Sequence, residues 1–252
     1  MRSTNRICFI AALLMIAVPL SARTYTTRFP ATENPICEGS PCNWTVGSAA
    51  GGNLWGNVQT TTGLAFGVSE PTQYGDPTAL LTGTWGPDQD VQATIKVNAI
   101  PAQGEVELRL RSTIAPNSIK GYEVLCPTQN NPGYGVQVVR WNGPNGQYVY
   151  LPQTGNTSAH QCKDGDIFRA TITGTNPVTI KVYLNGSLWT SATDNGSAYG
   201  GPGGAAGPWT SGNPGIGFYD AQDNNWSRFG FSEFTATDGA PLPPSGLSAT
   251  AH

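Results

Sequence analysis

The stretch Asp164–Gly186, which reads DGDIFRATITGTNPVTIKVYLNG, contains two of the clearest β-strand patterns in this sequence. Apolar and polar residues alternate over 167–173 and again over 179–184, which is the period of a strand with one buried face. An Asp-Gly pair precedes the first run and an Asn-Gly pair follows the second, and such pairs are typical of tight turns. The stretch therefore predicts two short strands bounded by turns.

The same alternation recurs along the chain, and after the amino-terminal segment no stretch keeps a helical period for three turns. Further clear strands are predicted at 91–97, 105–112, 135–141 and 229–236. Weaker ones are predicted at 24–29, 55–60, 64–68, 147–151, 187–193 and 215–219. About a dozen short strands predict an all-β protein, folded as a two-sheet antiparallel jelly-roll sandwich.

Several stretches resemble the concanavalin A-like lectin/glucanase and laminin G-like sandwiches. Residues 164–186 resemble the signature of this superfamily, a Gly-Asp pair, an apolar strand and Val-Tyr-x-Asn-Gly. Residues 34–36, 43–45, 215–218 and 229–234 are similar to its jelly-roll domains in exported bacterial proteins. The resemblance runs from Thr24 to Asp238. It implies that the first and last strands pair and that a bent sheet holds a ligand on its concave face. Lectins, glycosidases, lyases and adhesion modules share this fold, so the resemblance implies no single activity.

The two ends of the chain predict further segments. Residues 1–22 combine Arg2 and Arg6 with an uncharged apolar run from Ile7 to Leu20 and a small residue, Ala22, which is the pattern of an export signal. The run is shorter than the roughly 20 residues that span a membrane, so we expect no membrane insertion. Residues 23–238 form the sandwich. Residues 239–252 read as a proline-rich linker, followed by a start that resembles a fibronectin type III module.

The composition excludes several partners. Only 12% of the residues are charged, the formal net charge is −3, and the basic residues are scattered. Nucleic acids and anionic membranes need a clustered basic face, so neither is expected as a partner. Together with the export signal, this predicts a secreted, periplasmic or cell-surface protein.

Four cysteines remain after the export signal: Cys37, Cys42, Cys126 and Cys162. An even number in an exported chain predicts disulfides, for which three pairings are possible. Cys37 with Cys42 is a local pair, and Cys126 with Cys162 then follows by exclusion. The longer bridge would stabilise the fold by about 4 kcal/mol on the chain-entropy model.

The strand 105–111, which reads EVELRLR, is the most informative segment for function. Its valine and leucines are expected to face the core, because alternate strand residues point to opposite faces. The opposite surface is then charged, through Glu105, Glu107, Arg109 and Arg111. One interpretation is a solvated face of ion pairs. The other is the floor of a saccharide groove, in which Arg109 binds a uronate carboxylate.

Two kinds of polysaccharide-active enzyme are considered for this strand. Residues 107–109 match part of the Arg-x-Glu-Leu-Arg strand of alginate-lyase jelly rolls, but Glu105 replaces the first arginine and 135–141 lacks the expected histidine. A tyrosine would then donate the proton, with Tyr122 as the named candidate and Tyr148, Tyr150 and Tyr219 as alternatives.

Hydrolysis would need a pair of carboxyl groups, one of them held protonated. Laminarinase-type members present Glu-x-Asp-x-Glu, whereas residue 109 is an arginine here. Two neighbouring arginines should lower the pKa of the glutamates, which disfavours a general acid. We therefore rank a hydrolase below a lyase.

Aromatic residues offer a second route to sugar recognition, because apolar sugar faces stack on aromatic rings. Trp85 and Trp141 lie at predicted turns, where exposure is expected. With Gln137 and Tyr219, and with Glu105 and Arg111 of the charged strand, they are the candidate ligand-binding residues.

Two acidic loops are candidates for structural calcium, although no cofactor is required. Asp88 and Asp90 share one turn, and Asp220 and Asp223 share another. Carboxylates in loops suit this hard cation. The alternative is that these residues form turns through local hydrogen bonds.

One long loop, Tyr199–Asn213, is rich in glycine and proline and is expected to be a flexible rim, or alternatively a packed cover. No complete catalytic motif is present in the sequence. The sequence therefore predicts a carbohydrate-binding or adhesion module for an extracellular polysaccharide or glycan. The alternative is a polysaccharide-active enzyme that uses the charged strand.

Overall fold

The computed structural model describes residues 22–50, 55–68, 75–99, 104–128, 135–155, 161–220 and 226–239. These ranges form sixteen β-strands and two short 3-10 helices, η1 (Gly47–Ala50) and η2 (Trp226–Arg228). Residues 1–21 and 240–252 lie outside the described ranges, so the export signal and the linker remain predictions. Within the described residues, no helix has the length and apolar character needed to cross a membrane.

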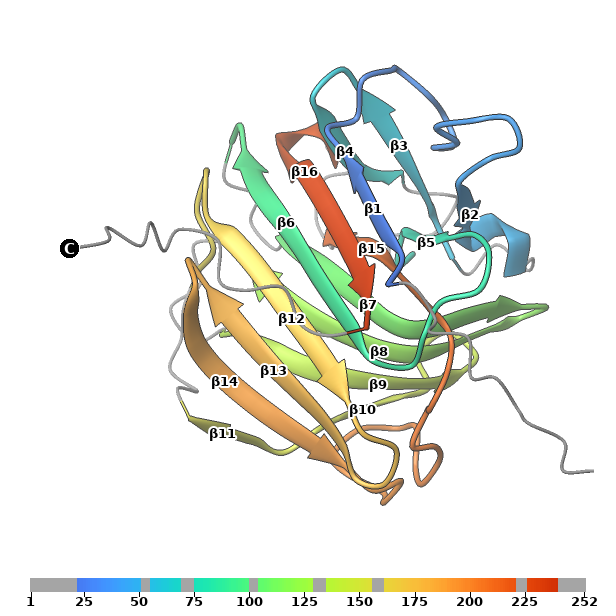
Figure 1. Ribbon diagram of the computed structural model, residues 1–252, viewed down its shortest axis with the longest axis vertical. Helices are drawn as coiled ribbons and strands as arrows, with labels where there is room; N and C mark the ends of the chain where they lie inside the picture. The colour runs from blue at the N-terminus through green and yellow to red at the C-terminus, as the bar shows by residue number, and fades with distance from the viewer. Residues whose placement is uncertain are drawn as a thin grey trace, which may run out of the picture.

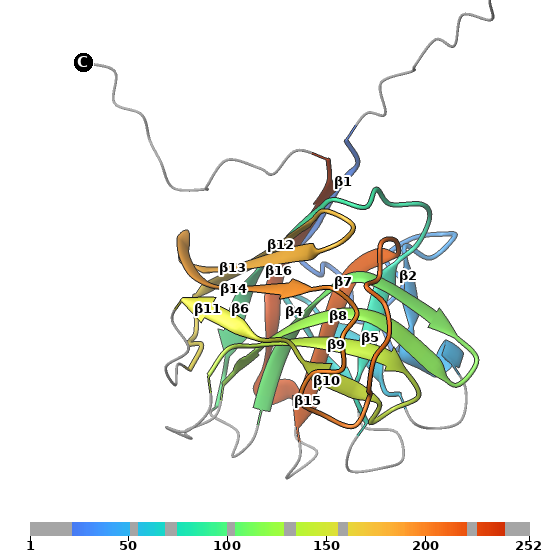
Figure 2. The ribbon, with the colours of Figure 1, turned by 90° about the horizontal axis from the view of Figure 1, so that it is seen from below.

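The strands form two antiparallel sheets stacked face to face (Figures 1 and 2). The first sheet runs β11 (Gln153–Gly155), β14 (Ser187–Asp194), β13 (Val178–Leu184), β12 (Ile167–Thr173), β6 (Gln89–Val97), β16 (Phe229–Asp238), β4 (Leu64–Val68) and β3 (Asn57–Thr61), and β1 (Thr24–Thr27) also pairs with β16. The second runs β10 (Tyr148–Tyr150), β9 (Gln137–Gly143), β8 (Ser118–Pro127), β7 (Gly104–Ala115), β15 (Asn213–Asp220), β5 (Thr78–Leu81) and β2 (Trp44–Val46).

This arrangement confirms the predicted all-β jelly-roll sandwich. Each strand predicted from the sequence is present, with its ends moved by a few residues. The first and last strands pair as expected, from Thr24 opposite Thr237 to Thr27 opposite Phe234. Strands β2, β5, β8 and β11 were not predicted.

The core lies between the two sheets and follows from the alternation of the strands. Val106, Leu108 and Leu110 of β7 are fully buried there, as predicted, together with side chains from the first sheet such as Phe168 and Ile180. Burying one such side chain stabilises the fold by about 1.5–3 kcal/mol, so this layer supplies most of the driving force for folding.

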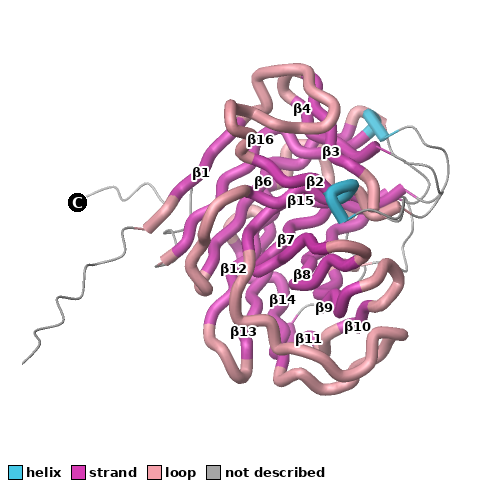
Figure 3. Tube along the Cα trace, turned by 90° about the vertical axis from the view of Figure 1, so that its right-hand side faces the viewer, coloured by secondary structure: helices cyan, strands magenta, loops and turns pink. Residues whose placement is uncertain are grey.

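A second, smaller apolar cluster covers part of the outer face of the second sheet. Ala50 of η1 and Trp55 pack there against residues of β8 and β9, namely Ile119, Leu125, Val139 and Trp141. Both short helices lie on the same side of the sandwich in Figure 3. This cluster matters for function, because it closes over a sheet face that the sequence predicted to be open.

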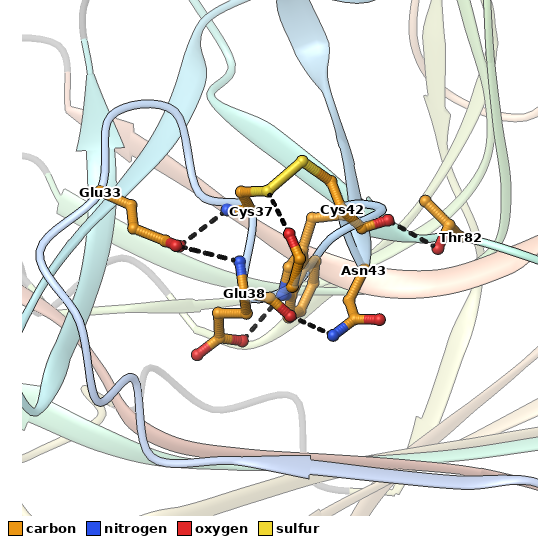
Figure 4. The surroundings of a disulfide bond; sticks show 8 residues. Glu33, Cys37, Glu38, Cys42, Asn43 and Thr82 are labelled. Carbon is orange, nitrogen blue, oxygen red and sulfur yellow. Dashed lines mark hydrogen bonds between the residues drawn. A yellow bond between two sulfur atoms is a disulfide. The ribbon is translucent and has the colours of Figure 1, made fainter.

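Both predicted disulfides are present. Cys126–Cys162 joins β8 to the segment before β12, across 36 residues. Cys37–Cys42 closes a short loop, shown in Figure 4, in which the Glu33 carboxylate accepts hydrogen bonds from the backbone N–H groups of Cys37 and Glu38. These bonds and the bridge fix the loop that leads into β2.

The glycine-rich loop 199–213 is hydrogen-bonded to β9, which favours the packed cover over the flexible rim. Arg140 donates to the carbonyl oxygen of Gly204, and Asn142 donates to that of Gly203. The indole N–H of Trp209 donates to the carbonyl oxygen of Trp141 at 2.9 Å. Carbonyl oxygens of the loop backbone thus accept hydrogen bonds from side chains of β9.

Candidate functional site

A pocket of about 270 Å³ opens on the outer face of the second sheet, on the side opposite the core. Strands β7 to β10, β15 and the segment before β5 contribute to it. Its lining combines carboxyl, amide and aromatic side chains: Asp76, Glu105, Glu123, Leu125, Gln137, Val139, Trp141, Asn145, Gly146, Tyr148, Tyr150 and Tyr219.

Strand register explains why these residues meet. Residues directly opposite one another in neighbouring strands point to the same face of a sheet. Tyr219 lies opposite Glu105, and Glu123 lies opposite Arg109. Further along the sheet, Leu125 lies opposite Gln137. Trp141 and Val139 face Tyr148 and Tyr150 across the β9–β10 hairpin.

Buried ion pairs form the base of the site. Arg109 is fully buried, and its guanidinium contacts the carboxylates of both Glu107 and Glu123, the second through Nη1 at 2.7 Å from Oε2. The Glu123 carboxylate also accepts a hydrogen bond from Nε1 of Trp141 at 2.6 Å. On the neighbouring strand, a Cβ at Gly217 would collide with the Glu107 carboxylate. A glycine is therefore needed at this point of β15 to leave room for the ion pair.

Burial changes the acidity of the carboxyl groups around Arg109. Burial, followed by the charge of Glu123, raises the pKa of Asp76 to about 7 and that of Glu105 to about 8. Burial also raises the pKa of Glu107 well above its usual value, against the effect of Arg109. The pocket therefore retains protons near neutral pH.

A row of aromatic rings runs from the second apolar cluster into the pocket. The ring centroids of Trp55 and Trp141 are 4.8 Å apart, those of Trp141 and Tyr148 are 5.1 Å apart, and those of Tyr148 and Tyr150 are 5.3 Å apart. Tyr150, at the outer end of the row, is 39% exposed. The row thus supplies an apolar surface that solvent reaches at one end.

The structure corrects the interpretation of strand 105–111. Its alternation is as predicted, but Glu107 and Arg109 are buried and do not form an open charged surface or an accessible groove floor. Arg109 is engaged by Glu107 and Glu123, so it does not present a free guanidinium to a uronate. The expected lowering of the glutamate pKa values is also wrong, because burial outweighs the arginine.

The Arg111 side chain does not line the pocket. The pairing of β7 with β8 shifts register after Leu110, and Arg111 itself has a positive φ of 45°. Its guanidinium donates instead to the carbonyl oxygens of Gly174 and Trp209 and pairs with Asp88 at 3.3 Å. A β-bulge of this kind redirects a side chain, which a regular alternation does not foresee.

Tyr122 faces the core, on the other side of the sheet from Glu107 and Arg109. Its hydroxyl donates to Asp194 at 2.7 Å and accepts from the backbone N–H of Trp209 at 2.9 Å. Burial and the Asp194 carboxylate raise the pKa of this hydroxyl. Tyr122 therefore does not reach the pocket, and the predicted trio of Glu107, Arg109 and Tyr122 does not come together.

The two candidate tryptophans differ. Trp85 is 5% exposed, belongs to the main core and lies under the Arg23 guanidinium, 4.4 Å from the ring centroid, so it does not line the pocket. Trp141 is 4% exposed and does line it. The exposure expected for both is wrong. Glu105, Gln137 and Tyr219, also named from the sequence, line the pocket with Trp141.

The three candidate calcium ligands that the structure describes do not come together in a metal site. Asp88 pairs with Arg111, Asp90 pairs with Arg169 at 2.5 Å, and Asp220 is buried at the end of β15. Asp223 lies outside the described residues. Among the residues that the structure describes, no three histidine, cysteine or carboxylate side chains are grouped so that they could hold a metal ion.

Asp76, Glu123 and Asn145 are pocket residues that sequence reasoning missed. Glu123 lies on β8, whose two faces are both buried, so the strand shows no alternation that would have revealed it. Asn145 belongs to an Asn-Gly turn that was predicted, but only as a turn. Asp76 precedes β5, a strand of four buried residues, and no sequence signal marks it.

The strand order and the two stacked sheets define a concanavalin A-like jelly-roll sandwich. No protein-family model matches the sequence, and no curated protein matches it. Solved structures do match. The β-porphyranase of the human gut bacterium Bacteroides plebeius aligns with a TM-score of 0.51 and 9% identity, over 90% of this chain and 96% of that one.

Two other structures are similar. A Bacillus subtilis protein of unknown function with a galectin-like fold gives a TM-score of 0.51 and 11% identity, over 84% of this chain and 98% of that one. A carbohydrate-binding module from Bacillus subtilis gives a TM-score of 0.46 and 14% identity, over 79% of this chain and 94% of that one. At these identities the first two matches establish the fold alone.

Proposed function

We propose that this protein binds a carbohydrate in the pocket on the outer face of its second sheet. The supporting observation is the composition of that pocket, in which aromatic rings lie beside carboxyl and amide groups. Sugars present an apolar face that stacks on such rings and hydroxyl groups that hydrogen-bond to such polar groups. The fold itself is shared with a β-porphyranase and with a galectin-like protein.

The polar groups of the pocket suit hydroxyl groups better than anions. The carboxyls of Asp76 and Glu105 accept hydrogen bonds when ionised and can donate one when protonated. Arg109, the guanidinium beneath them, is already paired with two carboxylates. A uronate would bring a further negative charge to this acidic site, so we expect neutral or cationic glycans to bind in preference to uronates.

The two disulfides favour an oxidising location. We propose that the protein acts outside the cytoplasm, as the predicted export signal at 1–22 requires, and that its ligand is an extracellular polysaccharide. In this proposal, residues 23–238 are the binding module, and residues 239–252 are a proline-rich linker whose end resembles the start of a fibronectin type III module.

A glycan array probed with the purified full chain tests the proposal, followed by titration calorimetry of the strongest ligands. Tyr148→Ala should weaken binding by about tenfold, because stacking on an aromatic ring contributes about 1–1.5 kcal/mol. Tyr183→Ala, on the outer face of the first sheet, is the matched control and should leave the affinity unchanged. Unchanged affinity in Tyr148→Ala would contradict the proposal. So would the failure of every glycan on the array to bind the protein.

Glycoside hydrolysis is a second candidate, favoured by one observation. Glu105 is partly exposed in the pocket, and its pKa of about 8 keeps it protonated at neutral pH, as a general acid must be. Incubation of the array ligands with the protein should then release new reducing ends, and Glu105→Gln should abolish the release. Binding without product would leave the protein a binding module.

A further inference from the structure

The pocket contains more acidic groups than basic ones. Its lining includes Asp76, Glu105 and Glu123, and none of the described lining residues is a lysine, arginine or histidine. Glu107 lies beside them on β7, and Arg109 is the cation paired with this group. The six internal stretches between the described ranges contain no lysine or arginine. Four carboxyl groups therefore surround one fixed positive charge.

The positive charge of Arg109 is already paired with carboxylates of the protein. The guanidinium of Arg109 is fully buried, and its two terminal nitrogens face Glu107 and Glu123. Among the described residues, neither Asp76 nor Glu105 forms an ion pair, and Asp76 receives an amide N–H from Asn145 at 3.4 Å. The two carboxyls are thus available to a group that enters the pocket.

Unused acceptors lie in the same place. Oε1 of Glu107 and Oε1 of Gln137 are buried and receive no hydrogen bond from the described residues, and Nε and Nη1 of Arg109 donate none, although Nη1 is ion-paired with Glu123. Buried acceptors without donors are costly, at about 1–3 kcal/mol each, and are rare in folded proteins. Gln137 lines the pocket, whereas Glu107, between Glu105 and Arg109 on the same face of β7, is fully buried and does not line it. A ligand in the pocket that brings hydrogen-bond donors would satisfy the Gln137 oxygen and bind the carboxyls of Asp76 and Glu105.

We propose that the pocket selects glycan units that carry a free primary amine, such as de-N-acetylated amino sugars. This inference rests on the proposed function and names the substrate class of the same site. An ammonium group brings three donors and one positive charge, which complement the carboxyls of Asp76 and Glu105 and the unpaired oxygen of Gln137. The rings of Trp141 and Tyr148 add a cation–π attraction and a stacking surface for the sugar.

The raised pKa values of the pocket carboxyls support this choice. The pKa of Asp76 is raised to about 7 and that of Glu105 to about 8, because burial, followed by the negative charge of Glu123, opposes their ionisation. In the absence of a cation, protons neutralise these groups. A bound ammonium would take over that role and release the protons.

The test compares oligosaccharides that differ in one substituent. Calorimetry at pH 7 measures the binding of β-1,4-linked oligomers of glucose, N-acetylglucosamine and glucosamine, and of the matching α-1,4-linked galactose series. In at least one series the amine form should bind about tenfold or more tightly than the other two, which corresponds to about 1.4 kcal/mol. This preference should shrink as salt is raised, because ions screen the charge of the ammonium.

Three outcomes would overturn the inference. Equal binding of all forms, or a preference for the neutral ones, would reject amine selection and leave glycan binding intact. Absence of binding to every member would reject it as well, while the glycan array decides separately on the proposed function. Oligolysine that binds as tightly as the glucosamine or galactosamine oligomer would show that the pocket recognises charge and not a sugar.

A pair of variants locates the effect. Glu105→Gln removes one negative charge from the pocket with little change of shape, and should weaken the amine oligomer about tenfold while changing the affinity for the neutral oligomer less than about threefold. Glu233→Gln removes the same charge from the outer face of the first sheet and should change neither. An equal loss for both ligands in Glu105→Gln would contradict amine selection.

Discussion

Arg109 and Arg140 lie on opposite faces of the second sheet, and both are fully buried, but their surroundings differ. Arg140 faces the core side and pairs with one carboxylate, Asp194, at 2.6 Å, while its other nitrogens donate to Asn142 and to the carbonyl oxygens of Ser197 and Gly204. Arg109 is shared by two carboxylates, with two more nearby and a pocket above them. At Arg140 one positive charge meets one carboxylate, whereas at Arg109 one positive charge lies among four carboxyl groups.

The difference shows how to separate structure from function in a buried charge cluster. In the Arg140 cluster, the Asp194 carboxylate also accepts from Tyr122 and from the backbone N–H of Gly196, so it is fully bonded within the protein. In the Arg109 cluster, Oε1 of Glu107 receives no hydrogen bond from the described residues, and the pKa values of the neighbouring Asp76 and Glu105 are raised. We interpret the first as a structural cluster that holds the covering loop and the second as a buried layer beneath a binding pocket.

The largest effect is expected from breaking the balanced cluster. Arg140→Met should lower the free energy of unfolding by about 3–5 kcal/mol, because it leaves Asp194 buried without its partner. Urea unfolding measures this loss. Arg28→Met, which removes an exposed ion pair with Glu233, is the control and should cost less than about 1 kcal/mol. A loss below about 1 kcal/mol in Arg140→Met would remove the contrast between the two clusters.

The unbalanced cluster should make stability depend on pH. Asp76 and Glu105 have raised pKa values of about 7 and 8 in the folded protein, against 3.8 and 4.5 when unperturbed. Unfolding therefore releases protons between about pH 4 and pH 8, and the free energy of unfolding falls as the pH rises through this window. Because solvent reaches the pocket, we expect a fall of about 2 kcal/mol from pH 5 to pH 8, below the full value of the two shifts.

Urea unfolding at a series of pH values checks this slope. Glu105→Gln should reduce the fall by about half, since it removes one of the two titrating groups, and Glu233→Gln should leave it unchanged. If the free energy of unfolding is constant or rises between pH 5 and pH 8, the pKa values of the pocket carboxyls are not raised in the folded protein.

Tyr122→Phe should have a smaller effect. It removes the hydrogen bonds of the hydroxyl with Asp194 and with the N–H of Trp209, at a cost of about 1–3 kcal/mol in stability. Because Tyr122 lies on the core side of the sheet, the affinity for glycans should not change. A loss of glycan binding or cleavage in the folded variant would restore the role that the sequence gave to this tyrosine.

The smallest effect on stability should come from the rim of the pocket. Tyr150 is 39% exposed, so Tyr150→Ala should change the free energy of unfolding by less than about 0.5 kcal/mol. It should nevertheless weaken glycan binding several-fold, because its ring extends the aromatic row. Calorimetry and urea unfolding on the same preparation separate the two quantities.

The sequence predicted the fold more completely than the site. Strands with one polar face, such as β12 and β13, show the alternation that reveals them, and cysteine counting gave the disulfides. Strand β8 has residues such as Ile119, Leu125 and Val124 on both of its faces, so it carries no alternation. Missing β8 meant missing Glu123, which lies opposite Arg109.

For strand β7, the sequence gave the right alternation and the wrong environment. It showed that Glu107 and Arg109 point away from the core, but not that η1 and Trp55 cover the adjoining face. The bulge that redirects Arg111 is likewise a tertiary effect, since it depends on the pairing with β8. Covering segments and bulges bring together residues far apart in sequence, which local patterns do not report.

The central claim is that the pocket above Arg109 binds a glycan, and chemical-shift mapping tests it directly. Titration of the ¹⁵N-labelled protein with the strongest array ligand should shift the signals of β8, β9 and β10, including the indole N–H of Trp141, which is bonded to Glu123. The outer face of the first sheet, around Tyr183 and Lys181, should stay unchanged. Shifts confined to that face, or no shifts at saturating ligand, would contradict the account.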